Sequence, residues 1–344
     1  MKALMKTKPG VGNVEIVDIP EPECTPNGVK VEVQYTGICG TDIHVYYDTF
    51  KNYPPVILGH EFSGIVREVG KEVKKIKAGD RVAVLGSTMV TCGECEYCRQ
   101  GYYMFCKIRR GMGHGVSGSF TRYVVVREDM CYKIPEKVSF EEAALCEPFA
   151  FAVQAVEELT TFNVGDVVLL SGPGPIGLLC LSLIVAHGCK VIVAGTKQDA
   201  LRFEIAKKMD ADIVVDVTSE SLDEIVNRET HGRGVDIALE CSGAESSVAN
   251  CLKSLRSLGK YIQCGIAGRE IKVNFDTILF KQLQVFGCVG HSLKSWDRVI
   301  SILEQGKVDL KPVITHKMPL SKWKEAFDMC ERKEGVKILL SYDG

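Results

Sequence analysis

The sequence has no excess of charge of either sign, because 42 lysine and arginine residues are balanced by 44 aspartate and glutamate residues, leaving a net charge of −2. Without surplus positive charge the chain has no general basic surface, so neither nucleic acid nor acidic lipid is expected as a partner. Compositional bias is also absent, since 46% of the residues are hydrophobic and 25% are charged. This balance excludes a disordered, collagen-like or coiled-coil chain.

A long apolar run is missing from the start of the chain, so no secretory signal peptide is expected. One internal stretch, Val167 to Cys189, lacks charged side chains and is long enough to suggest a membrane span. The sequence Gly172-Pro173-Gly174-Pro175 divides it, and a buried strand, a turn and a buried helix explain it better. We therefore expect no membrane association and a cytoplasmic location, where the 15 cysteines are thiols or metal ligands rather than disulfides.

The length of 344 residues indicates two domains. Residues 1–150 contain short Val- and Ile-rich runs broken by Gly, Pro and Asn, so this part is expected to be rich in β-strand. The strands predicted there are Val29–Tyr35, Phe62–Val69, Asp80–Leu85 and Phe120–Val126. A helix is predicted over Phe140–Leu159.

From Asp166 onward, predicted strands alternate with predicted helices, a pattern that indicates a parallel sheet wound on both faces. The predicted strands are Val167–Ser171, Lys190–Ala194, Asp212–Asp216, Val235–Glu240 and Lys260–Cys264, with one more after about Val285. The predicted helices are Ile176–His187, Asp199–Met209, Leu222–Glu229, Glu245–Leu255, Trp296–Gln305 and Leu320–Glu331.

Four closely spaced cysteines, Cys92, Cys95, Cys98 and Cys106, give the strongest motif in the chain. Two-residue spacers allow neighbouring sulfurs to converge on one ion, and four thiolates suit a closed, structural Zn²⁺ site. Four unrelated cysteines or an iron–sulfur cluster are the alternatives. A zinc ion there would hold together a lobe of about residues 90–108 that has little core of its own.

A second candidate metal site combines different ligand types. Cys39 begins the sequence Cys39-Gly40-Thr41-Asp42-Ile43-His44, and Gly59-His60-Glu61 follows. A thiolate, an imidazole and a carboxylate leave one position open for water or substrate, as in catalytic zinc sites. Glu147 is a further candidate ligand, and Asp42 is expected to accept the outer N–H of His60. Taken singly, such a histidine is more often a packing or surface residue.

These motifs together resemble the zinc-dependent medium-chain alcohol dehydrogenases. The resemblance includes Gly59-His60-Glu61-Phe62-Ser63-Gly64, Gly79-Asp80-Arg81-Val82, the four-cysteine lobe and the glycine turn described below, and it covers essentially the whole chain in order. Within the family, the sorbitol (L-iditol) and threonine dehydrogenase branch is the most similar. One reason is Glu147-Pro148, which stands where the ordinary alcohol dehydrogenases carry a cysteine zinc ligand.

The resemblance implies an α/β protein built from a GroES-like, β-rich catalytic domain and a Rossmann domain with a doubly wound parallel sheet. It implies that the catalytic domain consists of both chain ends, residues 1–151 and 287–344, around an inserted Rossmann domain at residues 152–286. It also implies two zinc ions per chain and a homodimer or homotetramer.

The sequence Gly172-Pro173-Gly174-Pro175-Ile176-Gly177 follows a predicted strand and opens a predicted helix, which is the setting of a dinucleotide-binding turn. The first glycine makes the turn, the second allows the pyrophosphate to approach, and the third lets helix and strand pack closely. The helix N-terminus at Ile176-Gly177 favours anionic phosphates. A glycine turn without a nucleotide is the alternative. The family resemblance places Cys264-Gly265-Ile266 and Val289 at the nicotinamide end.

The end of the second Rossmann strand bears on the choice between NAD and NADP. NAD enzymes usually place a carboxylate there, whereas this strand ends at Gly195-Thr196-Lys197, and Asp199 comes later. The sequence is similar to the Gly-Ser-Arg of NADP-dependent secondary-alcohol dehydrogenases. It therefore favours NADP, with Lys197 or Arg202 meeting the 2′-phosphate. Alternatively, Lys197 is a solvated turn residue and Thr196 bonds an ordinary ribose.

The expected reaction is hydride transfer from a secondary alcohol to NAD(P), giving a ketone, with zinc lowering the pKa of the hydroxyl. Thr41 is expected to accept the hydroxyl proton and pass it through the ribose to His44, since histidine is the side chain that titrates near neutral pH. His44 is alternatively only a surface residue. Glu61 and Glu147 are expected to alternate as zinc ligands.

The expected substrate class is a small secondary alcohol, a polyol or other vicinal diol. The polyol contacts of sorbitol dehydrogenases do not transfer cleanly, because Gly290-His291 stands where they carry Arg-Tyr, and Val45 precedes Tyr46-Tyr47. His291 and Tyr46 either line the pocket or pack inside the protein. The alternatives are a dehydrogenase or reductase for a bulkier alcohol or for L-threonine, and a thiol- or metal-sensing scaffold.

Overall fold

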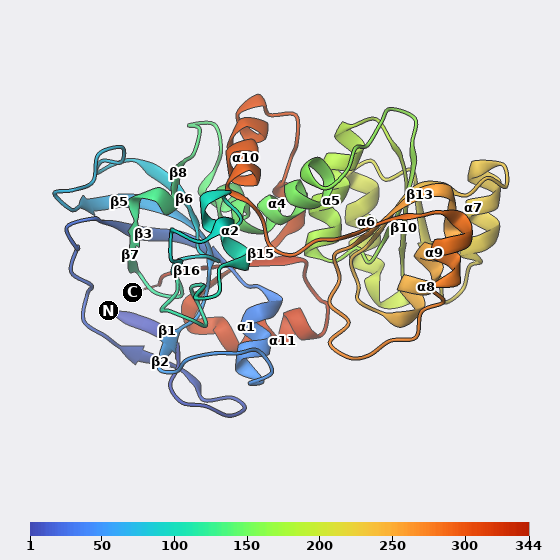
Figure 1. The fold of residues 1–344 in the computed structure, drawn as a ribbon. Coiled ribbons are helices and arrows are strands. Elements are labelled where there is room, and N and C mark those ends of the chain that lie inside the picture. The colour runs from blue at the N-terminus through green and yellow to red at the C-terminus, as the bar shows by residue number, and fades with distance from the viewer. Residues whose placement is uncertain (344) are drawn as a thin grey trace. The chain divides into compact units, whose positions relative to one another are not determined.

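The computed structural model describes residues 1–343 and divides the chain into two compact units. The first unit contains residues 1–150, 291–306 and 314–344, and the second contains residues 151–290 and 307–313. The first unit therefore includes both ends of the chain (Figure 1). This division differs from the predicted one at three places, because residue 151 and residues 287–290 and 307–313 belong with the second unit.

The first unit is built around a seven-stranded sheet that joins residues from both chain ends. In the sheet, β16 from the C-terminal end pairs antiparallel with β3, and Leu340 is opposite Thr36. The strands, in sheet order, are β15 (Ile314–Pro319), β16 (Lys337–Ser341), β3 (Gly28–Gly37), β5 (Glu61–Val69), β6 (Arg81–Leu85) and β8 (Cys131–Lys133), with β7 (Tyr123–Arg127) paired to β3. A second sheet has the order β2 (Val14–Asp18), β1 (Lys2–Lys6), β4 (Val56–Ile57).

Short helices complete the first unit. They are α1 (Gly40–Tyr46), α2 (Glu96–Arg99), α3 (Phe140–Ala144), the first part of α4 (Cys146–Val153), α10 (Leu293–Gln305) and α11 (Trp323–Glu331). The structure corrects the prediction of one helix over Phe140–Leu159, because α3 ends before Leu145 and Gln154–Glu158 is a π-helix. Pro148 has no amide hydrogen with which to continue the backbone hydrogen bonds of α3. It is tolerated in the first turn of a new helix.

The second unit contains a six-stranded parallel sheet with helices between its strands (Figure 1). Its strands, in sheet order, are β11 (Ile213–Asp216), β10 (Lys190–Gly195), β9 (Val167–Ser171), β12 (Val235–Glu240), β13 (Leu255–Gln263) and β14 (Gln284–Gly287). The helices are α5 (Pro175–Ala186), α6 (Ala200–Lys208), α7 (Leu222–Thr230), α8 (Glu245–Ser254) and α9 (Asp276–Lys281). All five residues of β9 are buried, as expected for a central parallel strand covered on both faces.

The charge-free stretch from Val167 to Cys189 forms β9, the glycine turn and α5, as the sequence predicted. Within residues 1–343, every helix is too short or too polar to cross a bilayer. The predicted strand Phe120–Val126 begins only at Tyr123, since the Phe120 carbonyl accepts the N–H of Leu4 in β1 instead. The elements that were not predicted are the strands β1, β2, β4, β8, β15 and β16 and the helices α1, α2 and α9.

Candidate functional site

Three predicted metal ligands converge within the first unit. Cys39 immediately precedes α1, and His60 and Glu61 lie where the chain enters β5. One ligand atom from each of the three lies within 4.8 Å of the other two. The His60 and Glu61 side chains are buried, so their charges are shielded from water and act strongly on one another.

Asp42 organises the backbone around this cluster. Its carboxylate accepts the N–H of Cys39 at 2.9 Å and the N–H of Gly59 at 3.1 Å. The predicted bond to the outer N–H of His60 is not formed, because Oδ1 of Asp42 lies 4.0 Å from Nδ1 of His60. Burial raises the pKa of Asp42. Burial also disfavours the imidazolium of His60, but the neighbouring Cys39, Asp42 and Glu147 outweigh it and place the pKa of His60 well above its usual value.

The Glu61 carboxylate has a buried cationic partner from the far end of the chain. Nζ of Lys337, at the start of β16, lies 2.5 Å from Oε2 of Glu61 and also donates to the carbonyl of Ile38 at 3.0 Å. Both side chains are almost fully buried, at 3% and 1% exposure. Burial disfavours the ammonium, but the charge of Glu61 outweighs it and raises the pKa of Lys337. Glu61 is therefore paired with a buried ammonium beside Cys39 and His60.

Glu147 lies outside this three-atom group and is held by a separate set of bonds. Trp296 Nε1 donates to His291 Nδ1 at 3.1 Å, so the proton of the neutral imidazole is on Nε2. Nε2 lies 3.1 Å from Oε1 of Glu147 and 3.0 Å from Oγ of Ser87. Burial opposes ionisation of Glu147, but the bonds to His291 and Ser87, together with the charge of His60, outweigh it and lower the pKa of Glu147. Glu147 is thus an ionised carboxylate near the cluster.

The chemistry of these donors fits zinc. Thiolate, imidazole and carboxylate are the ligand types of catalytic zinc sites, and three protein ligands leave a position open. A sulfur and two carboxylates concentrate negative charge around the His60 ring. Such a cluster is costly without a bound cation. The residues present therefore fit the metal that the sequence predicted.

The two residues of the predicted proton relay lie on α1. Thr41 Oγ1 is 3.6 Å from the sulfur of Cys39, which places the hydroxyl beside the metal ligands. His44 is exposed, and its Nδ1 lies 3.1 Å from Oγ1 of Thr49, which leaves Nε2 for exchange with water. Thr41 is therefore at the cluster and His44 is at the surface.

The four-cysteine motif also converges. Cys92, Cys95, Cys98 and Cys106 each bring a sulfur within 4.8 Å of the others. The sulfur of Cys92 lies 3.8 Å from that of Cys98 and 3.7 Å from that of Cys106. Four sulfurs bound to zinc at about 2.3 Å in a tetrahedron are about 3.8 Å apart, so the cluster has the size that zinc requires.

The predicted dinucleotide turn in the second unit has the expected local geometry. Gly172 has φ +99°, a conformation that other residues rarely adopt. A Cβ at Gly177 would lie 2.1 Å from the carbonyl oxygen of Gly172, so only glycine allows α5 to pack this closely on the turn. A Cβ at Gly174 would meet nothing within 4 Å, so space remains beside the start of α5, where Pro175 and Ile176 form the first turn. This space and the helix N-terminus suit a pyrophosphate.

A buried carboxylate that the sequence did not predict orders the neighbouring loop. Glu240, at the end of β12, accepts the N–H groups of Ser242 and Gly243 and the hydroxyl of Ser247. It also accepts Nε2 of Gln263 at 2.8 Å. Glu240 therefore fixes the loop that contacts the glycine turn.

The end of β10 carries no free carboxylate. Asp199 accepts the N–H and hydroxyl of Thr196, each at 3.0 Å, and pairs with Arg202 at 3.1 Å. Arg202 is thus already neutralised and mostly buried. Lys197 is exposed and forms no ion pair within residues 1–343. Of the two predicted phosphate-binding cations, Lys197 is the one whose charge is available.

The residues predicted at the nicotinamide end lie where β13 and β14 end. The N–H groups of Cys264 and Gly265 donate to the carbonyl of Glu240, and a Cβ at Gly265 would lie 2.2 Å from the nitrogen of Gly243. Ile266 and Val289 are unusually exposed for apolar residues, at 88% and 57%. Exposed apolar side chains at the carboxyl ends of parallel strands suit a planar ring.

Several residues at these sites were missed because their role depends on distant partners. Lys337 could have been suspected, because a lysine inside the apolar run Val336–Leu340 needs a buried counter-charge. Glu240 could have been suspected for the same reason, because it ends the wholly buried strand β12. Ser87 and Trp296 gave no signal in the sequence.

The comparisons with known proteins agree with this geometry. Residues 25–136 match the family model described as alcohol dehydrogenase GroES-like domain. Residues 175–305 match the model described as zinc-binding dehydrogenase.

Relatives along the whole chain are dehydrogenases. The chain is 38% identical over 342 residues to sorbitol dehydrogenase of Halalkalibacterium halodurans, which covers 99% of both chains. It is 38% identical over 342 residues to D-arabitol-phosphate dehydrogenase of Enterococcus avium, covering 99% of this chain and 97% of that one. It is 34% identical to L-threonine 3-dehydrogenase of Yersinia pseudotuberculosis over the full length of both.

Solved structures give the same result. The structure of 2R,3R-butanediol dehydrogenase from Bacillus subtilis superimposes with a TM-score of 0.90 at 30% identity, covering 99% of both chains. Among other similar structures, one is bound to NADP and another is complexed with NADH.

This chain belongs to the zinc-dependent medium-chain dehydrogenase family, in the branch of the sorbitol and threonine dehydrogenases. It is a polyol or alcohol dehydrogenase that uses zinc and NAD(P). The predicted fold, family and enzyme class are confirmed, and the thiol- or metal-sensing scaffold is set aside.

Proposed function

We propose that the enzyme oxidises the secondary hydroxyl of a polyol or other vicinal diol at the Cys39–His60–Glu61 cluster. The observation that carries this proposal is the convergence of those three ligand atoms within 4.8 Å, next to the Thr41 hydroxyl. Zinc bound there supplies Lewis acidity that lowers the pKa of the alcohol hydroxyl. The relatives named for sorbitol and for butanediol support this substrate class.

Side chains of the enzyme take up the hydroxyl proton and pair with the carboxylates of the site. Thr41 accepts the hydroxyl proton at Oγ1, and His44, with its free Nε2, exchanges a proton with water. Cys39 and His60 would hold the zinc ion, together with Glu61 or Glu147. Lys337 pairs with the first of these carboxylates and His291 bonds the second. The four cysteines of the lobe bind a second, structural zinc ion, giving two per chain.

An initial-rate matrix tests the substrate class. NAD and NADP are each assayed with sorbitol, xylitol, butane-2,3-diol, simple secondary alcohols, L-threonine and a steroid alcohol, with zinc present. We expect turnover of at least one polyol or diol and none of the steroid. Exclusive activity on L-threonine or on the bulky alcohol would overturn the proposed substrate class.

For the cofactor we propose NADP, because the charge of Lys197 is available and β10 ends without a free carboxylate. Replacing Lys197 with alanine is expected to raise KM for NADP about tenfold, through loss of one charged hydrogen bond, and to change KM for NAD less. Lys208→Ala, at the other end of α6, is the control and should alter neither. An unchanged ratio of the two KM values in Lys197→Ala would contradict this assignment.

We also propose that the enzyme is a homo-oligomer that forms along β14. This strand lies at the edge of the six-stranded sheet, so its outer backbone groups are available for pairing. Around it, Val285, Phe275, Leu279 and Phe280 are 48–81% exposed. A two-fold axis at this edge would bring the β14 strands of two copies together. The exposed apolar side chains of each copy would then be covered by those of the other.

We also propose a cytoplasmic location, since the cysteines of both predicted zinc sites must remain reduced.

A further inference from the structure

A cavity of about 330 Å³ in the first unit is lined by cations and by no carboxylate. We call it the basic pocket; the lining residues that matter are Lys51, Tyr53, Lys107, Arg109, Arg110 and His114. Burial, together with the charges of His60 and Arg109, lowers the pKa of His114 to about 4, so this ring is neutral near pH 7. The pocket therefore holds four positive charges. None of the four cations forms an ion pair within residues 1–343.

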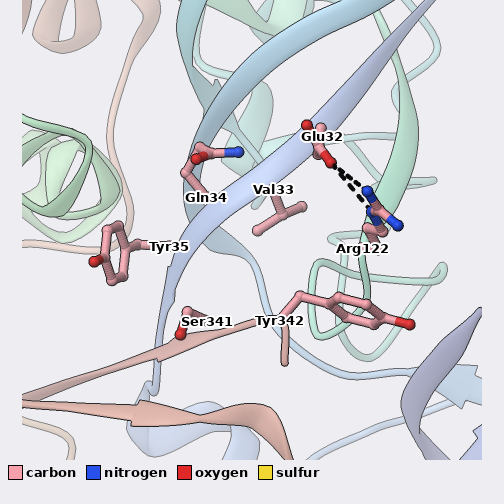
Figure 2. A pocket seen from close by; sticks show the side chains of 7 residues that line it. All are labelled: Glu32, Val33, Gln34, Tyr35, Arg122, Ser341 and Tyr342. Carbon is pink, nitrogen blue, oxygen red and sulfur yellow. Dashed lines mark hydrogen bonds and ion pairs between the residues drawn. The ribbon is translucent and has the colours of Figure 1, made fainter. Parts of the chain in front are cut away.

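Another pocket of the same unit has a different charge balance. In the pocket drawn in Figure 2, Arg122 points to Glu32 and pairs with it at 3.1 Å. Arg67 pairs with the other oxygen of the same carboxylate. The Arg122 charge in that pocket is paired with a lining carboxylate, whereas no carboxylate lines the basic pocket and only the charge of Glu147, beyond its lining, acts on Arg109. A concave surface with four cations outside any ion pair favours an anionic ligand.

The walls of the basic pocket are held by defined contacts. The guanidinium of Arg110 lies 4.5 Å from the ring centre of Tyr53, and Nζ of Lys51 lies 5.5 Å from it, so one aromatic ring supports two cations. The N–H of Tyr53 donates to the carbonyl of His114 at 2.9 Å. The His114 ring packs edge-on against Phe50 at 5.0 Å. The segments 50–53 and 107–115 are thus fixed to each other.

The pocket adjoins the metal cluster. Gly113 passes so close to Gly59, the residue before His60, that a Cβ there would lie 2.9 Å from the Gly59 nitrogen. Arg109 Nη1 donates to the carbonyl of Ser87 at 3.2 Å, and the hydroxyl of Ser87 bonds His291, the partner of Glu147. The basic pocket and the metal cluster are therefore built on adjoining segments, and Arg109 is linked through Ser87 and His291 to Glu147.

We propose that the basic pocket binds the phosphate group of a phosphorylated polyol, whose secondary hydroxyl is oxidised at the Cys39–His60–Glu61 cluster. This inference rests on the proposed function and narrows its substrate class. Two arginines match the geometry of a phosphate, and four cations suit a dianion rather than a single carboxylate. The phosphate ester is unchanged by the reaction. The alcohol carbon gives a hydride to the nicotinamide, the hydroxyl loses its proton, and a keto-phosphate results.

Matched substrate pairs test the inference on the whole zinc-loaded enzyme. Sorbitol and xylitol are compared with sorbitol 6-phosphate and xylitol 5-phosphate, and L-threonine is a further arm. We expect the wild type to prefer the phosphorylated member of at least one pair by tenfold or more in kcat/KM. Arg110→Gln should reduce that preference about 10- to 100-fold, since one charged contact is lost. Arg122→Gln, in the pocket of Figure 2, is the matched control and should leave the preference as in the wild type.

The outcomes separate the inference from the proposed function. Turnover of free and phosphorylated polyols at equal kcat/KM, unaffected by Arg110→Gln, overturns the phosphate site but leaves polyol oxidation intact. If Arg110→Gln lowers only the activity on L-threonine, the basic pocket binds a carboxylate. This result also overturns the inference. No oxidation of any polyol, free or phosphorylated, overturns the proposed function itself.

Discussion

Replacing Thr41 with alanine is expected to reduce kcat about 10²- to 10⁴-fold, the usual contribution of one positioned proton acceptor. The hydroxyl lies 3.6 Å from the sulfur of Cys39, beside the metal ligands, and alanine offers no group that could take the proton there. Because Thr41 is not itself a ligand, zinc content should remain that of the wild type. Steady-state rates and metal analysis on the same preparation check both statements.

The control for this experiment is Thr41→Ser, which keeps the hydroxyl and removes only a methyl group. It should retain most of the wild-type kcat. An alanine variant with near wild-type kcat would exclude Thr41 as the proton acceptor. Loss of zinc in the alanine variant would instead assign the side chain a structural role in the cluster.

Replacing Lys337 with methionine is expected to destabilise the enzyme by about 3–5 kcal/mol, because Glu61 would remain as a buried carboxylate without its counter-ion. The measurement is the denaturant midpoint at fixed zinc concentration, together with zinc content. Since Glu61 belongs to the three-atom cluster, the zinc that binds there should also be held less tightly. The variant therefore combines a stability effect with a metal effect.

Lys317→Met is the matched control for Lys337→Met. Lys317 lies on β15, the neighbouring strand, and pairs with Glu141 at 3.1 Å, but its side chain is 54% exposed. Its loss should shift the midpoint little, because water replaces the partner. The double variant Lys337→Met with Glu61→Gln should recover part of the stability lost in the single variant, since the buried charge is gone. Equal midpoints for Lys337→Met and Lys317→Met would contradict the argument.

The parts of the site that could be predicted are those encoded by short sequence spacing. Cys92, Cys95, Cys98 and Cys106 lie within 15 residues, and His60 is adjacent to Glu61, so their convergence needs only a local turn. The alternation of strands and helices in the second unit could also be predicted, because each buried parallel strand is a short apolar run followed by a helix. Here the predicted strands Val167–Ser171 and Val235–Glu240 have the observed bounds.

The parts that could not be predicted depend on residues far apart in the chain. Glu61 and Lys337 are separated by 276 positions, and Glu147 and His291 by 144. No periodicity connects such residues, since only the pairing of β16 with β3 and the position of α10 bring them together. The basic pocket was missed for a related reason. The run of cations after Cys106 is visible in the sequence, but only the fold adds Lys51 to it and excludes carboxylates.

The pairing of Glu61 with Lys337 also has a consequence for the order in which the chain matures during synthesis. Translation produces Cys39, His60 and Glu61 well before Lys337, which comes 276 positions after Glu61. Throughout most of translation the Glu61 carboxylate has no counter-ion, and β3 lacks its neighbour β16. The six-stranded sheet, in contrast, comes entirely from residues 167–287 and can close while the ribosome is still adding residues. The first unit is therefore completed after the six-stranded sheet of the second.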